Sequence, residues 1–520
     1  MKVALSIREM SNLSPMFHTK CIRSIERREL STFERIGLYK SDCPYAKHSM
    51  FSCRISRSSF ERNSDTERRL ADAGISTRAM IEYIAATQYR GGGVKPGNDD
   101  VESLLAIMNE VISIGGICDA IHLDVANHTI EKLGSGRYGI YDDVFSDNVG
   151  EFAATRTIES VNGQIEDFES KMARMAVRPD TKEKNKDAEL EEIDVAFLED
   201  WGVSYSNILQ FLYVCYIIAM KQQKSVIEME ESQLIKAMQE HCTELTEDLA
   251  KKCIIRLSLD KRENYLTPPV GLAGKDIFPW SYNRELSYLR RPVIRYQYDD
   301  GTVMCMFGFR SCIQAGIQLS DLLYSGRLRY VGRKIETLLG KFEAIKGAAF
   351  NDEVRSFLAK IPIMRVWEHD VTIKSGGYFA ADKDYGDIDV MAYDTSRDIL
   401  YLIECKNTNP AKNIKEMKTE MDEYLGRGDN PERDKKRALV LKHLRRHRWV
   451  TEHINEVAKH IGVAVTPRVK SMMLTATVIP TSYLKREKIP MSILNYPELK
   501  IKGVNLLDSC KEPDLSVLDI

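Results

Sequence analysis

The sequence lacks the features that mark several common protein classes. Its 520 residues carry a net charge of −2, so any nucleic-acid-binding surface must be local rather than a property of the whole chain. The 11 cysteines include no CxxC pair, which argues against zinc ribbons and zinc fingers. Their odd number in a large chain favours a reduced intracellular protein. The longest apolar run, Ile208 to Met220, is too short to span a bilayer and is typical of a buried helix.

Two further absences narrow the function and the location. The chain has no GxxxxGK[ST] motif, so an energy-dependent step would need another subunit to bind the nucleotide. The N-terminus mixes Lys, Arg and Glu without a continuous apolar core, unlike a secretory signal. We therefore expect a cytoplasmic protein that does not enter a membrane, although nothing in the sequence excludes the nucleus.

The composition is that of a soluble globular protein, with 43% hydrophobic and 29% charged residues. The length predicts about two to four domains. We divide the chain into a weakly periodic segment, a helical region, a charged linker or solvated helix, a mainly helical region, an α/β domain and a C-terminal tail. The corresponding ranges are 1–65, 66–176, 177–193, 194–330, 331–485 and 486–520. The fourth region should contain helices over 194–258 and one strand pair, at 293–298 and 302–309.

The most informative pattern consists of two neighbouring apolar strands with acidic residues at alternate positions. The first strand carries Asp387 and Asp389, and the second carries Glu404 with Lys406 two places later. A strand sends residues i and i+2 to the same face, so each pair points in one direction. If the strands pair, carboxylates and an ammonium group converge on one patch.

Such a patch suits the hydrolysis of a phosphodiester. The reaction needs an activated water, neutralised charge on the phosphate and a stabilised leaving oxygen, and one or two divalent ions can supply all three. Mg²⁺ (or Mn²⁺) prefers hard oxygen ligands and keeps several waters, so two or three acids suffice to hold it. A lysine can orient the water or stabilise charge in the transition state.

The elements around this pattern form a recognisable order. From about residue 332 onward the sequence predicts a helix, three strands, two helical segments and a further strand, the order αβββα(α)β. The predicted ranges are 333–360, 364–374, 385–393, 399–406, 413–425, 438–461 and 469–480.

Gly386-Asp387-Ile388-Asp389, followed after 14 residues by Glu404-Cys405-Lys406, resembles the PD-(D/E)xK motif of the restriction endonuclease-like nuclease superfamily. The resemblance covers about residues 333 to 485, and the proline of the motif is absent. It implies an α/β domain with an αβββαβ core and a mixed sheet. It also implies that Asp389 and Glu404 bind the metal, that Lys406 is catalytic and that Asp387 is an accessory or competing acid.

The same resemblance implies accessory residues. Glu353 takes the place of a metal-binding acid on the first helix, while Glu420 and Tyr424 match a glutamine and tyrosine four residues apart, with Glu replacing Gln. Basic residues beside the proposed site could contact phosphates, with Trp449 stacking on a base, and a solvated helix face explains them equally well. These residues are Lys435, Lys436, Arg437, Arg445, Arg446 and Arg448.

The sequence therefore predicts a mainly helical N-terminal region joined to a metal-dependent nuclease, with DNA favoured over RNA and an endonuclease favoured over an exonuclease. The helical region would recognise a protein partner, a signal or the substrate, as in restriction or antiviral defence systems, an expectation based on architecture alone. Cutting a duplex with one site per chain would call for a homodimer. The alternative is a catalytically inactive nuclease fold that binds nucleic acid or acts as a scaffold.

Overall fold

The structure is a computed structural model, and its described residues form two compact units. The helical unit comprises those within Glu9–Asp119 and Asp180–Phe342, and the sheet unit those within Ala120–Pro179 and Glu343–Ile520. The described residues are 64–87, 98–125, 128–134, 138–142, 148–152, 155 and 183–519 without 225, 263, 264, 282, 330, 410, 412, 429 and 430. The predicted N-terminal segment 1–65 lies almost entirely outside them.

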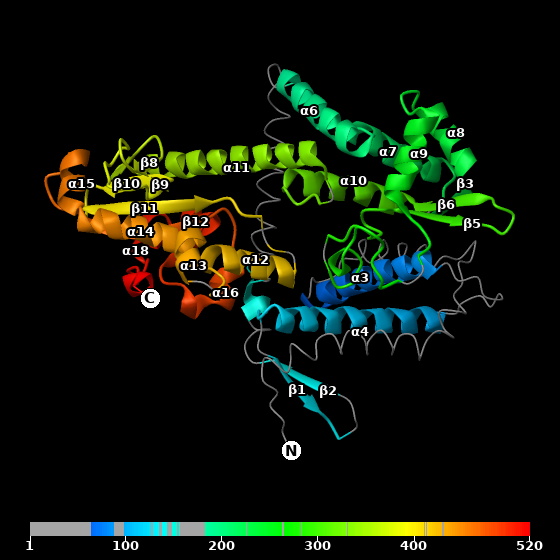
Figure 1. Cartoon of the computed structure of the whole chain (residues 1–520), viewed down its shortest axis with the longest axis horizontal. Helices are drawn as coiled ribbons and strands as arrows, with labels where there is room; N and C mark the ends of the chain where they lie inside the picture. Colours follow the sequence, from blue (N-terminus) through cyan, green and yellow to red (C-terminus); the bar gives the residue numbers. More distant parts are fainter. Residues whose placement is uncertain are drawn as a thin grey trace. The chain divides into compact units, whose positions relative to one another are not determined.

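Helices dominate the helical unit, and one four-stranded sheet of order β3-β6-β5-β4 accompanies them (Figure 1). Its helices are α3 (Ser64–Thr87), α4 (Asn98–His122), α6 (Glu183–Trp201), α7 (Tyr205–Lys221), α8 (Glu231–His241), α9 (Glu247–Leu257), η1 (Gly274–Asp276) and α10 (Phe309–Tyr324). Its strands are β3 (Val226–Glu230), β4 (Ser258–Leu259), β5 (Val293–Gln297) and β6 (Val303–Gly308).

The predicted strand pair is confirmed, because β5 and β6 are antiparallel and turn at Gly301, whose φ is +87°. The prediction of helix throughout 194–258 is wrong at Val226–Glu230, which forms β3. The reason is local: Val-Ile-Glu-Met-Glu alternates apolar and acidic residues, and Ile227 is buried while its neighbours are half-buried. The charged segment from Glu183 onward is part of α6, with Ala188–Glu192 exposed.

The sheet unit contains a hairpin and a larger α/β body (Figure 1). The hairpin pairs β1 (His128–Lys132) with β2 (Tyr138–Asp142). The strands of the body are β7 (Met364–Val366), β8 (Val371–Ile373), β9 (Gly386–Ile388), β10 (Val390–Asp394), β11 (Ile399–Lys406), β12 (Arg468–Thr475) and β13 (Ser492–Asn495). Its helices are the second half of α11 (Arg333–Ala359), α12 (Ile414–Leu425), α13 (Pro431–Arg437), α14 (Leu439–Glu452), α15 (Ile454–Ile461), α16 (Thr481–Leu484), η2 (Arg486–Lys488), α17 (Tyr496–Lys502), α18 (Val504–Asp508) and η3 (Leu515–Leu518).

The body is built on a mixed five-stranded sheet of order β13-β12-β11-β10-β7. β11 is antiparallel to β10 and parallel to β12. Helix α11 covers one face through Val354 and Leu358, whereas α14 and α15 cover the other through Trp449 and Val457. Figure 1 shows β11 between α11 and α14. The sheet is therefore buried on both faces, which is why β11 is apolar along most of its length.

The prediction of a helical region over 66–176 is wrong at the β1–β2 hairpin, where Thr129 and Ile130 pair with Tyr141 and Ile140, residue types that favour strands. Three details of the α/β body also differ from the prediction. The first two predicted strands are each broken in two, so β8 and β9 form a separate two-stranded sheet. The break between β9 and β10 falls at Asp389. The predicted tail 486–520 belongs to the fold, since β13 extends the sheet and Leu499, Leu506 and Leu507 of the following helices are buried in its core.

Candidate functional site

Strand β11 presents two charged side chains at the end of an apolar strand. Ile403 and Cys405 face the α11 side of the sheet, in the same core as Phe350 and Val354. The period of two then places Glu404 and Lys406 on the α14 side, following Leu402. The predicted division of faces along β11 is confirmed.

The register between β10 and β11 brings the acidic residues of the two strands together. Val390 lies opposite Ile403, so Asp389 and Glu404 come next to each other at the end of the ladder. The backbone N–H of Cys405 donates to Oδ2 of Asp389 at 2.8 Å. Nζ of Lys406 lies 2.8 Å from Oε1 of Glu404 and 3.8 Å from Oδ2 of Asp389. Asp389, Glu404 and Lys406 therefore form one cluster, as the sequence pattern predicts.

Three aspartates form a candidate metal site beside this cluster. One carboxylate oxygen each of Asp370, Asp387 and Asp389 lie within 4.8 Å of one another. Among the described residues, this is the one group of three or more Asp, Glu, His or Cys side chains close enough to hold an ion. Hard carboxylate oxygens, two of them exposed, suit Mg²⁺ or Mn²⁺ with several retained waters.

Asp370 was missed by sequence reasoning because it lies 17 residues before Asp387 and outside the motif. The available signal was weak: an acid directly before the short strand β8, whose partner in the two-stranded sheet is β9. Arg355 of α11 holds Asp370 in place, because its Nη2 donates to the Asp370 carboxylate and to the backbone oxygen of Asp389, the latter at 2.6 Å.

Glu404 lies in a more cationic setting than the aspartates. Nη1 of Arg446 donates to its Oε2 at 2.5 Å, and Nδ1 of the buried His443 lies 3.7 Å from the same oxygen. With Lys406 on its other oxygen, the carboxylate is 5% exposed and already paired. The charge of Glu404 is therefore already compensated by Lys406 on one oxygen and by Arg446 on the other.

Burial and charge move the pKa values of this cluster in opposite directions. Burial, followed by repulsion from Glu404, raises the pKa of Asp389 to about 7. Burial alone would also raise the pKa of Glu404, but Lys406 and Arg446 outweigh it and lower that pKa. Burial opposes the charge on Lys406, yet Glu404 and Asp389 raise its pKa. The ammonium and the Glu404 carboxylate are thus ionised, and a cation near Asp389 would favour its ionised form.

The close approach of Arg446 explains the glycine of the motif. Nε of Arg446 donates to the backbone oxygen of Tyr385 at 3.0 Å. A Cβ on Gly386 would lie 2.9 Å from Nη2 of Arg446, and Gly386 has a φ of +87°. Both the space and the backbone conformation therefore require glycine at this position.

The predicted accessory residues lie outside the aspartate group. Glu353 is exposed on α11 and hydrogen-bonds Tyr496, whose pKa rises to about 12 through burial and this neighbour. The buried Glu420 accepts hydrogen bonds from the N–H and hydroxyl of Thr481, the latter at 2.7 Å. The Tyr424 ring is fully buried in the core beneath β12. In this structure the last two residues support packing.

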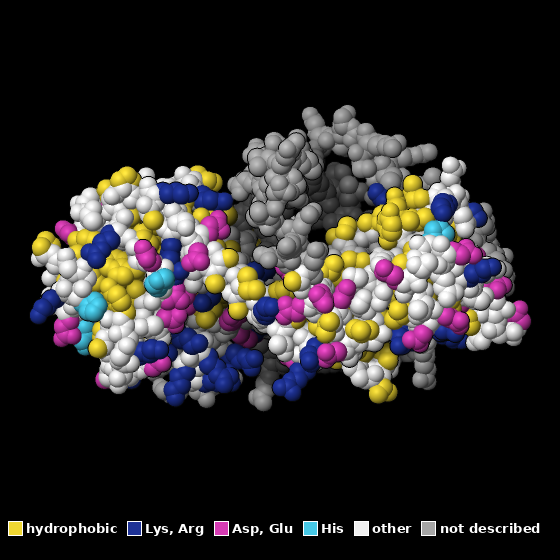
Figure 2. Space-filling view, turned by 90° about the horizontal axis from the view of Figure 1, so that it is seen from above, with side chains coloured by type: hydrophobic (Ala, Val, Ile, Leu, Met, Phe, Trp, Pro, Cys, Tyr) yellow, Lys and Arg dark blue, Asp and Glu magenta, His cyan; other side chains and the backbone are white. Residues whose placement is uncertain are grey.

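The predicted nucleic-acid-binding residues divide into two groups. Arg446 is bound to Glu404, and Arg448 donates to Asp519 and to the backbone of Leu515. The exposed Lys436 and Arg437 remain on the surface, while Arg445 is half-buried. The side chain of Lys435 lies outside the part of the chain that the structure describes. Lys and Arg side chains gather along the lower edge of the sheet unit, at the left in Figure 2.

Base stacking by Trp449 does not fit the structure. The Trp449 ring is 5% exposed and stacks on His453 with centroids 4.5 Å apart. Tyr385 and Phe379 also contact it, so its role is to pack α14 against the sheet.

Comparison with known proteins identifies the family. A model of the Upx-like anti-phage protein family matches residues 56–492. The chain belongs to this family. The match includes residues of the helical unit as well as the aspartate cluster, and membership of this family suggests a role in phage defence. No curated protein and no solved structure matches the chain.

One segment of the Upx-like chain bears on its location. Leu105–His122 of α4 is long and apolar enough to cross a membrane by length and composition. It carries Glu110 and Asp119, and the core helices of soluble proteins meet the same criteria, so it is weak evidence for a span. Helices α6 and α7, which together are also apolar enough, are bent by 89°.

Proposed function

We propose that this Upx-like protein is a metal-dependent nuclease that cleaves nucleic acid, DNA in preference to RNA, as part of phage defence. The single observation that carries the proposal is the convergence of Asp370, Asp387 and Asp389 beside Lys406. Paired strands of the mixed sheet bring Asp389 and Lys406 together from positions that match the PD-(D/E)xK pattern, with Asp387 two residues before Asp389, and Asp370 joins them from outside that pattern. The family match supports the defence role.

The donor set fits a divalent ion. Three carboxylates with one oxygen each near a common point would hold Mg²⁺ or Mn²⁺ and leave room for water and a phosphate oxygen. When bound, the ion polarises the phosphate and lowers the pKa of a bound water. Without it, burial, the charge of Glu404 and, least, that of Asp370 disfavour the ionised form of Asp389 and raise its pKa.

Lys406 is the residue that would act on the reacting atoms. Its ammonium lies at the edge of the aspartate group, where it can orient the attacking water or stabilise charge developing on the phosphate. Glu404 fixes the ammonium, and Arg446 fixes Glu404, so the lysine is held before substrate arrives. We assign Glu404 and Arg446 as positioning residues. The exposed Lys436 and Arg437 would contact the substrate backbone.

The test is a cleavage assay on the full chain with Mg²⁺, Mn²⁺ or EDTA. Linear and circular duplex DNA, single-stranded DNA and RNA are the substrates, and cutting of the circle shows endonuclease activity. Asp389→Asn and Lys406→Met should each reduce the rate by about 10²-fold or more. The matched controls are Asp382→Asn and Lys374→Met, which change exposed residues outside the aspartate group and should keep the wild-type rate.

Two results would overturn the proposal. Full activity in both Asp389→Asn and Lys406→Met would remove this site from the reaction. Nucleic-acid binding that needs no divalent ion, with no cleavage of any of the four substrates, would favour the inactive scaffold.

A further inference from the structure

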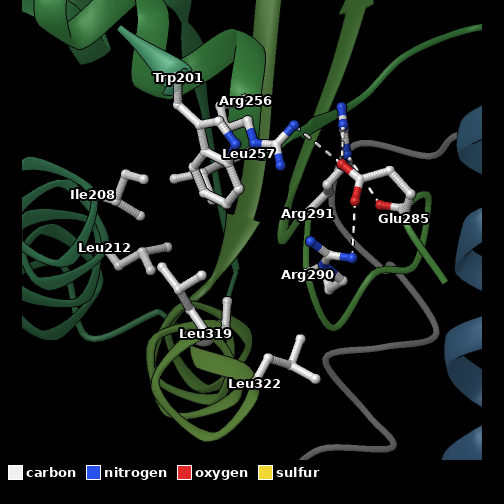
Figure 3. A pocket seen from close by; sticks show the side chains of 11 residues that line it. Trp201, Ile208, Leu212, Arg256, Leu257, Glu285, Arg290, Arg291, Leu319 and Leu322 are labelled. Atoms are coloured by element: carbon white, nitrogen blue, oxygen red, sulfur yellow. Dashed lines mark hydrogen bonds and ion pairs between the residues drawn. The ribbon is translucent and has the colours of Figure 1, made fainter. Parts of the chain in front are cut away.

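The helical unit contains a pocket whose lining differs in chemistry from the aspartate cluster. Figure 3 shows a pocket between α6, α7, α9, α10 and the segment that precedes β5. Its cavity of about 30 Å³ opens to solvent and exceeds the roughly 10–15 Å³ that one water requires. One wall is apolar, and its main side chains are Trp201, Ile208, Leu212, Leu319 and Leu322.

The opposite wall consists of three arginines around one carboxylate (Figure 3). Oε1 of Glu285 lies 2.7 Å from Nη2 of Arg291 and 3.1 Å from Nη1 of Arg256. Its Oε2 lies 2.8 Å from Nη1 of Arg290. Glu285 is 3% exposed, and the side chain of Arg290 is 8% exposed. The four charged groups are therefore held at the base and side of the pocket rather than on the open surface.

The charges of this wall do not balance. Three guanidinium groups face one carboxylate, which leaves two positive charges in a partly desolvated site. Arg329 and the buried Asp276 add one charge of each sign near Arg290, so the difference of two stays the same. Burial and, to a smaller extent, repulsion from Arg329 lower the pKa of Arg290, and attraction to Asp276 raises it. Burial is the largest effect on Arg256 and lowers its pKa to about 10. An excess of buried positive charge is costly unless a bound anion compensates it.

The hydrogen-bonding capacity of the arginines is only partly filled. Arg291 donates through its three nitrogens, to the backbone oxygens of Glu285 and Ser258 and to Oε1 of Glu285. Nη1 of Arg290 is buried and close to Glu285, but it lacks the geometry of a hydrogen bond. Arg256 lies 3.8 Å over the ring of Trp201, which holds its guanidinium in a fixed plane. The donors are thus present, oriented and incompletely used.

We propose that this pocket binds the phosphate group of a small molecule, either free phosphate or a mononucleotide. A phosphate monoester carries a charge of about −1.5 to −2 near neutral pH, which matches the two excess positive charges, whereas a carboxylate would leave one uncompensated. Planar guanidinium groups bind phosphate oxygens in pairs. The cavity of about 30 Å³ is small, so the body of a mononucleotide would remain at the mouth. The site is independent of the nuclease proposal.

The experiment measures phosphate binding to the full chain by calorimetry and by thermal unfolding at constant ionic strength. Inorganic phosphate and adenosine monophosphate are the probes, sodium chloride is the reference, and a short single-stranded DNA represents polynucleotides. Phosphate should raise the unfolding temperature of the wild type. Stronger binding of adenosine monophosphate than of phosphate would identify a nucleotide site, and equal binding a free phosphate site.

Three variants distinguish an anion site from a structural ion cluster. Glu285→Gln removes the competing carboxylate and should tighten phosphate binding by about tenfold or more, since it removes a negative charge beside the anion. Arg290→Met should weaken binding by a similar factor. Arg295→Gln changes a half-buried arginine paired with Glu231 in the same unit and should leave binding unchanged.

The proposal is overturned if phosphate and adenosine monophosphate fail to bind the wild type. It is also overturned if Glu285→Gln binds phosphate no more tightly than the wild type, because a purely structural cluster predicts destabilisation without gain of affinity. If Arg290→Met does not fold, Glu285→Gln still decides. Binding of the DNA alone, with neither small probe, would make the pocket a polynucleotide contact and equally overturn the proposal.

Discussion

Arg446 is the residue that connects the candidate site to the helix behind it. From the sequence it was one of several basic residues that could have contacted phosphate, and its neighbour Arg448 was interchangeable with it. In the structure the two have different roles, because Arg446 is 7% exposed and bound to Glu404 while Arg448 pairs with an Asp519 that is 68% exposed.

This pair gives a matched prediction. Arg446→Met should destabilise the fold by about 3–5 kcal/mol and abolish cleavage, because it leaves the Glu404 carboxylate buried with fewer cations. Arg448→Met should cost about 0–1 kcal/mol and leave cleavage intact. Urea unfolding and the cleavage assay measure both. Equal effects of the two substitutions on stability and cleavage would contradict the assignment of Arg446 as a positioning residue.

The buried His447 should make the stability of the fold depend on pH. Its ring is 5% exposed, Nδ1 lies 2.8 Å from the hydroxyl of Ser471, and burial lowers its pKa from 6.5 to about 4. Between these two values the unfolded chain binds a proton that the folded chain does not, so stability falls as the pH falls. The loss should reach about 3 kcal/mol at pH 4.

The measurement is the free energy of unfolding of the wild type and His447→Gln at several pH values between 7 and 4. The variant should show a shallower decrease than the wild type, because its side chain does not titrate. Parallel curves would show that His447 contributes nothing to the acid sensitivity.

At the level of elements, the helices after residue 485 contribute to the stability of the sheet unit, although their sequence was interpreted as a tail. Leu507 of α18 is fully buried in the core of the sheet unit, whereas Ile501 of α17 is 80% exposed. Leu507→Ala should cost about 2–5 kcal/mol. Ile501→Ala should stay within about 0.5 kcal/mol of the wild type. Chemical unfolding measures both, and a small effect of Leu507→Ala would mean that this segment is dispensable.

The elements that could be predicted from the sequence are those whose local pattern agrees with their final environment. Strand β11 is a continuous apolar run buried on both faces, so its bounds were predicted correctly. Strand β13 has only half-buried residues and lies between two prolines, so its sequence gives little sign of a strand. Asp370 depends on the pairing of β8 with β9, a tertiary contact that no spacing in the sequence encodes.

For the whole molecule, the nuclease proposal and the family membership make one joint prediction. Bacteria that produce the wild-type chain should resist phage, and Asp389→Asn should return plaque formation to that of cells without the protein. Asp382→Asn should protect like the wild type. The measurement is the efficiency of plating at equal protein levels. Full protection by Asp389→Asn would separate the defence role from this site.

The break at Asp389 has a consequence for the choice of ion. Asp370 and Asp387 lie at or beside the two-stranded sheet, and Asp389 lies at its junction with the five-stranded sheet. The spacing of the three oxygens therefore depends on how the two sheets are angled, and no single rigid ladder fixes it. We expect the site to tolerate different ionic radii, so Ca²⁺, with oxygen distances of about 2.3–2.6 Å, should compete with Mg²⁺, with about 2.0–2.1 Å. Competition calorimetry would detect the displacement of Mg²⁺ by Ca²⁺. If Ca²⁺ does not bind at all, the spacing of the three oxygens is fixed and this expectation is wrong.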